Sequence, residues 1–354
     1  MFARFLPLLA ALIAASAAHG QYVRVWGADA YGQCTIPPDL GTVIDVSHGG
    51  SHLLAVTTGG QVRAWGRNTS GQAAVPPTTG MATAVAAGGQ HSLALRTDGT
   101  VAAWGSNTYG QASVPADLGG CIKVAAGDVH SLAVASDGSV RAWGRNNLGQ
   151  CSVPAGMAAA VAVSAGTGYS VAALADGSAR AWGRNDYGQS TPPEGLAGVV
   201  SVAAGGQHSL ALRSDGTIAA WGRNNYGQLV VPTDLGPCQA VSAGRTHSMA
   251  LSADGRVRCW GTSNFYGQVT VPAGIAGVTR ISAGADGNAV IAPAPAPICW
   301  GDLDASRNVD GVDLGRLLAA WGRMDGPPED IDRDDLVDGR DLGLMLATWG
   351  PCLN

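Results

Sequence analysis

The chain repeats one pattern of apolar and polar positions over most of its length. In residues 91–105, two runs of alternating apolar residues flank the polar pair Asp98-Gly99, which is the signal of a β-hairpin with a tight turn. A polar turn containing Gly and Asn follows, and then a short extended run that ends at Pro115. Residues 121–127 form a further apolar run in which Ala and Gly are frequent. Each unit therefore predicts three or four short antiparallel strands.

The unit recurs at a fixed period. Trp-Gly pairs are 39 residues apart, each is followed by a Gly-Gln pair, and an Asp-Gly pair precedes most of them. The Trp-Gly pairs begin at Trp26, Trp65, Trp104, Trp143, Trp182, Trp221 and Trp260. The only change of length is one added residue near Phe265 and Tyr266. Because a single small sheet cannot bury both of its faces, the seven copies predict sheets that stack side by side.

The two ends of the repeat predict how the stack is closed. The first copy contains only the strand that carries Trp26, residues 22–26, and the last copy, residues 281–292, lacks that strand. We expect residues 22–26 to pair with residues 288–292, so that both ends of the chain complete one sheet. The sequence therefore predicts an all-β, seven-bladed β-propeller over residues 21–292, closed by its N-terminal strand.

Residues 1–20 precede the repeat and differ from it in composition. Arg4 is followed by the apolar run 5–15 and by small residues up to Gly20, which is the pattern of a signal peptide; an uncleaved signal anchor is the alternative. No other segment is long and apolar enough to predict a membrane-spanning helix. We therefore expect a protein that is secreted or held at the cell envelope after this segment is removed.

Composition and charge narrow the range of folds and partners. Only 13% of the residues are charged and 52 of 354 are Gly, which argues against long helices. The net charge of −5 is uneven, because residues 299–354 carry 12 acidic and 5 basic side chains, a charge of −7. The rest of the chain therefore carries +2 (−5 minus −7). Neither part is basic enough to predict a nucleic-acid-binding surface.

The C-terminal segment predicts a separate calcium-binding module. The predicted linker, residues 293–298, alternates Pro and Ala up to Pro297, as a semi-rigid spacer does, and residues 299–354 contain two related acidic loops. Oxygen-bearing residues recur at positions 1, 3, 5, 7, 9 and 12 of each loop, with a backbone carbonyl at position 7, which is the spacing of a calcium loop. The predicted ligands are Asp302, Asp304, Ser306, Asn308, Asp310 and Asp313 in the first loop, and Asp330, Asp332, Asp334, Leu336, Asp338 and Asp341 in the second. A short apolar helix follows each loop; an acidic helical tail without metal is the alternative.

Seven cysteines in an exported chain allow disulfides. Cys299 and Cys352 bracket the acidic segment and could join its two ends. For the remaining cysteines, the alternative to a disulfide is a small buried apolar side chain. These residues are Cys34, Cys121, Cys151, Cys238 and Cys259.

The repeated histidines are one candidate site on the propeller. They are His52, His91, His130, His208 and His247, with Tyr169 and Gly287 at the same place in the other two copies. A ring of His could suggest a metal. The same local hydrogen-bonding need in each repeat explains the recurrence better, so we predict a structural role.

The polar turns after the Trp-Gly pairs are the second candidate site. Tyr and Arg recur there, and these residue types are enriched where protein surfaces bind one another. The residues are Tyr31, Tyr109, Tyr187, Tyr226 and Tyr266, with Arg67, Arg145, Arg184 and Arg223. Two interpretations stay open: these residues form a protein-binding face, or Tyr packs on the next blade and Arg keeps a Gly-rich surface soluble.

The sequence shows no catalytic constellation. No copy contains a paired carboxylate or a nucleophile and base at a recognisable spacing, so we predict a protein that is not an enzyme. The alternatives are a propeller enzyme that acts on an extracellular polymer, and a structural component of the cell envelope. Charged residues gathered at one axial mouth of the ring would favour the enzyme.

Two resemblances extend this prediction. The pattern G-x-x-H-S-L-A-L, followed by D-G-x-V-x-A-W-G-x-N-x-x-G-Q, resembles the regulator of chromosome condensation repeat family over residues 22–292, in the short form of the secreted β-lactamase inhibitory propellers. That resemblance implies a seven-bladed propeller that acts through protein–protein contacts. Residues 299–354, with Asp at position 12 of each loop, resemble a dockerin module, which implies a cohesin-type partner. We therefore expect an exported, non-enzymatic binding protein that is anchored or docked through its calcium-binding module.

Overall fold

The computed structural model describes residues 21–293, 303, 308–309, 311–320, 342, 345–346 and 350–351. The chain divides into two compact units, and residues 20–293 form one of them. The predicted signal peptide and the predicted linker beyond Pro293 lie outside the described residues. Within the described ranges, no helix has the length and apolar character needed to cross a membrane.

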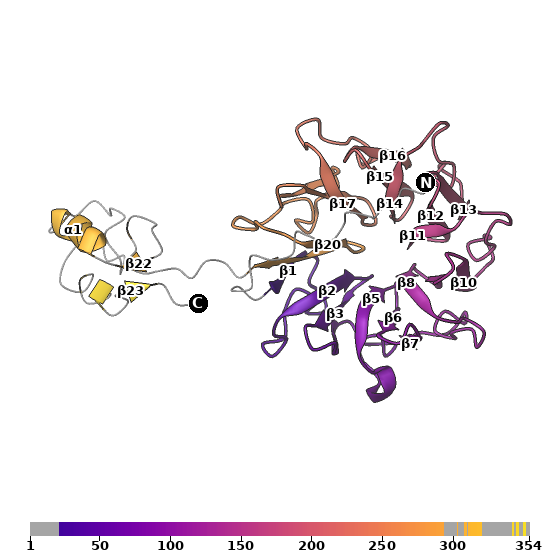
Figure 1. Cartoon of the computed structure of the whole chain (residues 1–354), viewed down its shortest axis with the longest axis horizontal. Helices are drawn as coiled ribbons and strands as arrows, with labels where there is room; N and C mark the ends of the chain where they lie inside the picture. The colour runs from indigo at the N-terminus through magenta and orange to yellow at the C-terminus, as the bar shows by residue number, and fades with distance from the viewer. Residues whose placement is uncertain are drawn as a thin grey trace, which may run out of the picture. The chain divides into compact units, whose positions relative to one another are not determined.

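Residues 21–293 form seven three-stranded antiparallel sheets arranged radially around an axis (Figure 1). We number the sheets as blades 1 to 7. Blades 1 to 3 contain β2 (Val43–His48), β3 (His52–Thr57) and β4 (Val62–Gly66); β5 (Ala82–Ala87), β6 (His91–Arg96) and β7 (Val101–Gly105); and β8 (Cys121–Ala126), β9 (His130–Ala135) and β10 (Val140–Gly144). A 3-10 turn, η1 (Pro77–Thr79), lies between β4 and β5.

The other four blades follow the same plan. Blades 4 to 6 contain β11 (Ala160–Ala165), β12 (Tyr169–Leu174) and β13 (Ala179–Gly183); β14 (Val199–Ala204), β15 (His208–Arg213) and β16 (Ile218–Gly222); and β17 (Cys238–Ala243), β18 (Ser248–Ser252) and β19 (Val257–Trp260). Blade 7 contains β20 (Arg280–Ala283), β21 (Gly287–Pro293) and β1 (Gln21–Gly27). The predicted all-β architecture of seven sheets is confirmed. Each blade has three strands, because the run that ends at Pro115 and its equivalents are loops.

The burial of each strand explains its composition. The middle strands lie between two neighbouring blades, and the first five residues of β6 (HSLALR) are all buried. The inner strands, such as β5 (ATAVAA), contact the inner strands of both neighbours, and their small side chains suit this crowded position. Each apolar cluster joins two blades: Leu54 and Val56 of blade 1 pack with Ala94 and Trp104 of blade 2. The core is therefore a ring of interfaces between blades.

The predicted Asp-Gly turns join the middle and outer strands. Gly99 has a φ of +81°, which side chains other than hydrogen rarely allow. Asp98 Oδ1 accepts hydrogen bonds from the backbone N–H of Thr100 (2.9 Å) and from its Oγ1 (2.7 Å). These bonds hold the pKa of Asp98 below its ordinary value. The hairpin prediction is confirmed.

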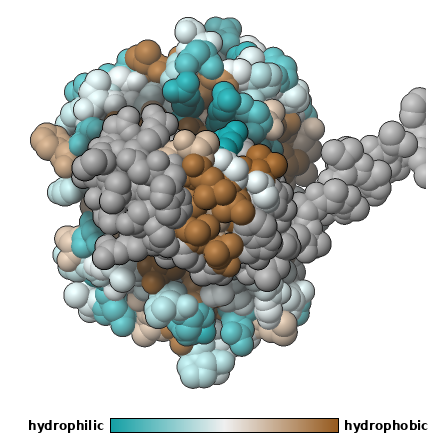
Figure 2. Space-filling view, turned by 90° about the vertical axis from the view of Figure 1, so that its left-hand side faces the viewer, coloured by the Kyte–Doolittle hydropathy of each residue, from teal (hydrophilic) through white to brown (hydrophobic). Residues whose placement is uncertain are grey.

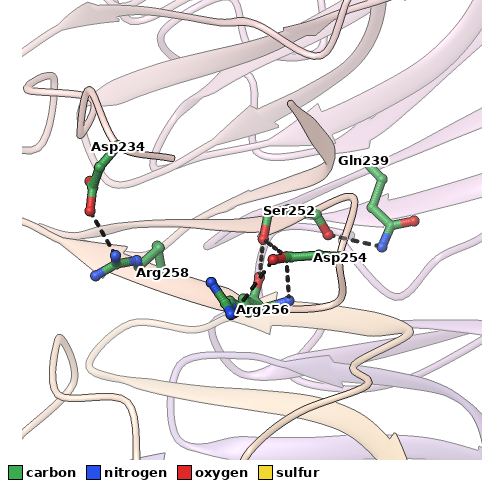
Figure 3. A network of polar contacts seen from close by, with 6 residues as sticks. All are labelled: Asp234, Gln239, Ser252, Asp254, Arg256 and Arg258. Atoms are coloured by element: carbon green, nitrogen blue, oxygen red, sulfur yellow. Dashed lines mark hydrogen bonds and ion pairs between the residues drawn. The ribbon is translucent and has the colours of Figure 1, made fainter. Parts of the chain in front are cut away.

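Figure 3 shows the corresponding turn of blade 6, in which Asp254 Oδ1 accepts hydrogen bonds from Ser252 Oγ (2.6 Å) and the backbone N–H of Arg256 (3.2 Å). On the adjoining outer strand, Arg258 Nη2 lies 2.7 Å from Asp234 Oδ2. The same ion pair occurs in two other blades, as Arg63–Asp39 and Arg141–Asp117. All three pairs are exposed, so they contribute little to stability.

The two ends of the propeller sequence meet in blade 7. β1 pairs with β21 in an antiparallel register that places Tyr22 opposite Ala292 and Trp26 opposite Asn288, as predicted. Blade 7 also bonds to blade 1, because the Ala285 N–H donates to the Gly49 carbonyl (3.1 Å). Equivalent backbone bonds join the other successive blades: Gly50 to Gly88, Gly89 to Gly127, Asp128 to Gly166, Thr167 to Gly205, Gly206 to Gly244 and Arg245 to Ala285.

The C-terminal unit has a small core of its own in the described residues. The helix α1 (Gly311–Ala319) follows the strand β22 (Asn308–Val309), which pairs antiparallel with β23 (Gly350–Pro351). A helix was predicted after the first acidic loop, and α1 occupies that place. The buried residues of this core are Val309, Leu317, Ala320 and Met345.

Candidate functional site

Seven loops connect the outer strand of one blade to the inner strand of the next, and a buried Gln fixes each of them. In the loop 106–120, Gln111 Oε1 accepts the backbone N–H of Tyr109 (2.8 Å). The Gln111 carbonyl accepts hydrogen bonds from Trp143 Nε1 (3.0 Å) and Ser131 Oγ (2.9 Å) of the following blade. Asn107 Oδ1 caps the loop by accepting the N–H of Ala112 (2.9 Å). The Trp and Gln of the repeat therefore act by positioning the loop.

We call the surface formed by these seven loops the loop face. The loops bond to the turns between inner and middle strands, as where the Arg67 N–H donates to the Ser51 carbonyl (2.9 Å). All five predicted tyrosines are exposed on the loop face, with exposed fractions between 36% and 58%. Figure 2 views the propeller from its side, so its upper and lower margins show the propeller's outer edge, where polar residues in teal and apolar residues in brown are interspersed.

Three of the four predicted arginines lie over tyrosine rings of the preceding loop. The pairs, with the distance from the guanidinium carbon to the ring centre, are Arg67–Tyr31 (5.0 Å), Arg145–Tyr109 (4.7 Å) and Arg223–Tyr187 (4.7 Å). Stacking of this kind attracts the cation to the ring and holds a long side chain in one place. The structure therefore brings together six of the nine predicted residues as pairs that bridge neighbouring loops.

The remaining predicted residues of the loop face behave differently. Arg184 Nε lies 2.6 Å from Asp186 Oδ2, so its charge is paired within its own loop. Among the described residues, no arginine lies over Tyr226 or Tyr266, because Thr262 and Ala28 stand at the arginine position of the following loops. Among the described residues, no carboxylate forms an ion pair with any of the three stacked arginines.

The repeated histidines form hydrogen bonds between blades, as predicted for a structural role. His52 Nε2 lies 2.9 Å from Ser92 Oγ of the next blade, and Ser92 Oγ donates to the Gln72 carbonyl (2.8 Å). The serine has one proton, which it gives to the carbonyl, so it accepts from His52 Nε2–H. The same contact recurs as His91–Ser131, His130–Ser170 and His208–Ser248, and as His247 with the amide oxygen of Asn288.

Burial keeps these imidazoles neutral. It lowers the pKa of His91 and His130 to about 4, and that of His52 and His208 to about 3. The pKa of His247 is lowered by the same cause. Tyr169 takes the histidine position in blade 4 and donates its hydroxyl to the carbonyl of His208. No three His, Cys, Asp or Glu side chains of the described residues are arranged to hold a metal ion.

The boundary between blades 7 and 1 uses a different arrangement. Gly287 replaces the histidine and Leu53 replaces the serine of the other boundaries. His48, where every other blade has Ala, fills the space: a Cβ on Gly287 would lie 2.6 Å from His48 Nε2. His48 is buried, its Nδ1–H donates to the Gly49 carbonyl (3.0 Å), and burial lowers its pKa to about 4. The boundary that joins the chain ends is therefore packed by its own set of residues.

We expect His48→Ala to lower the free energy of unfolding by roughly 2–4 kcal/mol, because it leaves a cavity the size of an imidazole. The triple variant His48→Ala/Leu53→Ser/Gly287→His restores the residues of the other boundaries and should recover most of this loss. Urea unfolding of both variants and of the wild type measures the effect. A triple variant that is less stable than His48→Ala would contradict the exchange of residues described above.

Charged residues of both signs lie at the opening of the axial channel and on the inner strands around it. At the loop face, Arg245 Nη1 lies 3.7 Å from Asp286 Oδ2, and Asp128 lines the same opening. Further along the inner strands, Asp45 Oδ2 accepts the N–H of Val85 (2.9 Å), and burial raises the pKa of this carboxyl. These groups are of both signs and do not form a pair of carboxylates or a nucleophile with a base.

The five described cysteines all carry free thiols. Burial raises the pKa of Cys34 and Cys151 to about 11, so these thiols stay protonated and are poor nucleophiles. Cys151 Sγ lies 3.2 Å from the Arg145 carbonyl and takes the place of a serine hydroxyl in the next loop. Their role is that of small, partly buried side chains. The predicted disulfide partners Cys299 and Cys352 lie outside the described residues.

Of the predicted calcium ligands, only Asn308 and Asp313 are among the described residues. Asp313 is buried in the first turn of α1, and its Oδ1 accepts the backbone N–H of Leu303 (2.6 Å). Arg316 Nη1 donates to the backbone carbonyl of Leu303 (2.5 Å). Leu303 and Asp313 are positions 2 and 12 of the first loop, so these contacts bring its two ends together.

Three residues with unusual surroundings were not singled out by the sequence analysis. His48 stands where six blades have Ala, Val230 where the other loops have small or hydroxyl residues, and Phe265 where they have small or polar residues. These three departures from the repeat are visible when the seven copies are aligned column by column. The predicted binding face contains only residues that recur from loop to loop.

The comparisons with known proteins agree with the repeat. The model of the regulator of chromosome condensation (RCC1) repeat matches residues 43–72, 82–111, 121–150, 160–189, 199–228 and 238–268, just over half of the 354 residues. Each match runs from an inner strand to the Gly-Gln pair of the following loop. No curated protein sequence matches the chain.

Several solved structures share the fold. Prp20p from Saccharomyces cerevisiae, described with its binding to Gsp1p and histones, has a TM-score of 0.67 at 19% identity, covering 78% of this chain and 92% of that chain. Human WBSCR16 has a TM-score of 0.63 at 19% identity, covering 77% of this chain and 99% of that chain. At these identities the likeness concerns the fold, while the six repeat matches concern the family. The chain belongs to the regulator of chromosome condensation (RCC1) repeat family.

Proposed function

We propose that this protein is an exported, non-enzymatic binding protein whose propeller recognises a protein partner through the loop face. The observation that carries the proposal is the set of three Tyr–Arg pairs that bridge neighbouring loops. Their guanidinium groups form no ion pair with a described carboxylate, so they are available to a partner. Tyr and Arg held in this way supply contact area and charged hydrogen bonds with little loss of side-chain entropy.

The competing function is an enzyme that acts on an extracellular polymer. General acid–base catalysis needs a titratable group that can reach the substrate. The six histidines of the propeller are buried and neutral, and the charges at the channel opening and on the inner strands are of mixed sign. The exposed Tyr–Arg pairs favour binding over catalysis. Prp20p, which shares the fold, is described as binding Gsp1p and histones, so binding proteins use this architecture.

The triple variant Arg67→Ser/Arg145→Ser/Arg223→Ser should weaken partner binding by at least about tenfold, because it removes the three stacked cations. Proteins of the culture medium and the cell envelope, titrated against the immobilised chain, provide the measurement. The matched control is Arg63→Ser/Arg141→Ser/Arg258→Ser, which removes the same charge from the outer strands. Equal binding by the two triple variants would refute the loop face as the binding surface.

The C-terminal unit supplies the second part of the proposal, a calcium-dependent docking module of dockerin type. The acidic positions of both loops provide hard oxygen ligands, which calcium prefers. The contact of Asp313 with Leu303 supports a closed first loop. Such a module would attach the propeller to a cohesin-type partner or to another component outside the cell.

Calcium added to the full chain should bind at two sites and raise the melting temperature of the C-terminal unit, because ligands that bind only the folded state stabilise it. Titration calorimetry and thermal melting with and without a chelator measure this. The variants Asp302→Ala and Asp330→Ala should each remove one site. Absence of binding heat in the wild type would leave the acidic helical tail as the better account.

A further inference from the structure

The loop 262–279 differs from the other six loops in its path. It contains the one added residue of the repeat, near its start. The Thr262 N–H donates to the carbonyl of Tyr226 in the neighbouring loop (2.5 Å), whereas the equivalent N–H of Arg223 donates to the carbonyl of Gln207 in a turn between inner and middle strands (2.9 Å). The backbone of Thr262 therefore links this loop directly to the loop 223–237.

This loop exposes a phenylalanine. Phe265 is 90% exposed, the highest value among the large apolar side chains of the described residues. The equivalent position in the other loops holds small or polar residues: Ala30, Thr69, Thr108, Asn147, Asp186 and Asn225. An apolar ring in water is unfavourable, so its presence at one loop only points to a surface that covers it in a complex.

Further apolar side chains surround Phe265 in sequence and on the neighbouring loop. Tyr266 and Tyr226 are exposed and have no arginine over them. Val230 is 64% exposed and stands where the loop 106–120 has Ser113. Ser113 Oγ accepts a hydrogen bond from Asn107 Nδ2 (2.9 Å), and valine cannot form this bond. We call Tyr226, Val230, Phe265 and Tyr266 the aromatic sector.

A positive charge lies on the same loop as Tyr226 and Val230. Arg223 stacks on Tyr187, and its Nη1 donates to Gln207 Oε1. A carboxylate of a partner would pair with this guanidinium group at the edge of the sector.

We infer that the aromatic sector is the anchor of the protein interface proposed above, on which this inference rests. The partner is a protein with an apolar pocket that receives Phe265 and with a carboxylate at the rim of that pocket that meets Arg223. Buried aromatic side chains at the centre of an interface, with charges at its edge, are the arrangement of binding hot spots.

Other classes of ligand fit the sector less well. A sugar stacks on a ring that the protein holds from behind, and a ring that is 90% exposed has neither face supported. A nucleic acid or another polyanion would meet the carboxylates Asp128 and Asp186, which are exposed on the same face. A protein pocket needs neither a supported ring nor a uniformly positive surface.

The test uses small disulfide-constrained peptides displayed on phage and selected on the full chain. Phe265→Asn installs a residue that two other loops have at this position, and Leu148→Asn removes an exposed apolar side chain from another part of the loop face. We expect the selected peptides to combine apolar residues with Asp or Glu. Phe265→Asn should weaken them at least about tenfold, Arg223→Gln to a smaller extent and Leu148→Asn not at all, with unchanged melting temperatures.

The outcomes separate this inference from the proposed function. Peptides that depend on Arg67 and Arg145 but not on Phe265 would keep the loop face as the binding surface and overturn the anchor. Peptides that bind all variants equally would overturn both. Binding of purified polysaccharides that Phe265→Asn abolishes would replace the protein partner with a glycan.

Discussion

A chain that starts at Gly27, and so lacks residues 21–26, should melt at least roughly 15 °C below a chain that starts at Gln21, or fail to fold. Val23 and Trp26 of the deleted strand are buried in two different clusters, one towards blade 1 and one towards blade 6. Loss of these two side chains alone costs roughly 5–8 kcal/mol. For a domain of this size, each kcal/mol corresponds to roughly 2–4 °C.

The deletion also opens the edge of β21 and separates blade 7 from blade 1. Seven residues of β1 pair with β21, and Trp26 Nε1 donates to the Gln268 carbonyl (3.3 Å). Differential scanning calorimetry of both chains measures the effect. A synthetic peptide of residues 21–27, added to the shortened chain, should restore part of the stability, because the strand edge of β21 is left free to bind it. An unchanged melting temperature would show that the strand does not hold the ring closed.

A second large effect should appear when the pH is lowered. The six histidines of the propeller are buried and neutral in the folded state, with pKa values of about 3 to 4 where a value is defined. In the unfolded chain, each imidazole binds a proton near pH 6.5. Between about pH 6.5 and 4 the unfolded state therefore binds more protons, and stability falls as the pH falls.

The size of this effect follows from the number of histidines. Each one contributes a slope of roughly 1.4 kcal/mol per pH unit in that window, so six contribute roughly 8 kcal/mol per pH unit. We expect cooperative unfolding near pH 5, which thermal melts between pH 7 and 4 would detect. Hydrogen bonds lower the pKa of the Asp-Gly turn carboxylates below the ordinary carboxyl value of about 4. Their contribution to stability is therefore lost only as the pH falls below about 4, outside the range in which the histidines titrate.

A single substitution separates histidine titration from other acid effects. His91→Gln keeps a side-chain N–H that can donate to Ser131 and removes one titrating group. The variant should lose about one sixth of the pH slope, while its stability at pH 7 falls because the amide fits the site less well. A melting temperature that stays constant from pH 7 to 4.5 would mean that the imidazoles are protonated in the folded state.

Much of the fold follows from local patterns in the sequence. Alternating apolar residues around Asp98-Gly99 predict a hairpin because the turn requires a positive φ, and the missing Trp strand in the last copy predicts the pairing of β1 with β21. The sequence left open whether the extended run before Pro115 is a fourth strand or a loop, since its assignment depends on whether a partner strand lies beside it. The structure has none there, and three strands per blade result.

The candidate site could be predicted only in part. The recurrence of Tyr and Arg locates both types on the loops, since each copy of a repeat occupies an equivalent place. It does not tell which arginine reaches which ring: Arg223 stacks on Tyr187 of the preceding loop, whereas Arg184 turns to Asp186 of its own. Such choices depend on contacts between blades and on long side chains with several rotamers.

The sequence by itself determined the repeat, its period and the exchange of strands at the chain ends, because these depend on residue order and hydrophobic pattern. Tertiary structure decided which departures from the repeat matter. His48 fills the space beside Gly287 across the boundary of blades 7 and 1, and Phe265 reaches solvent on a loop that Thr262 links to its neighbour. The first is a contact between residues far apart in the chain, and the second is the absence of such a contact. The period of the repeat carries no information about either.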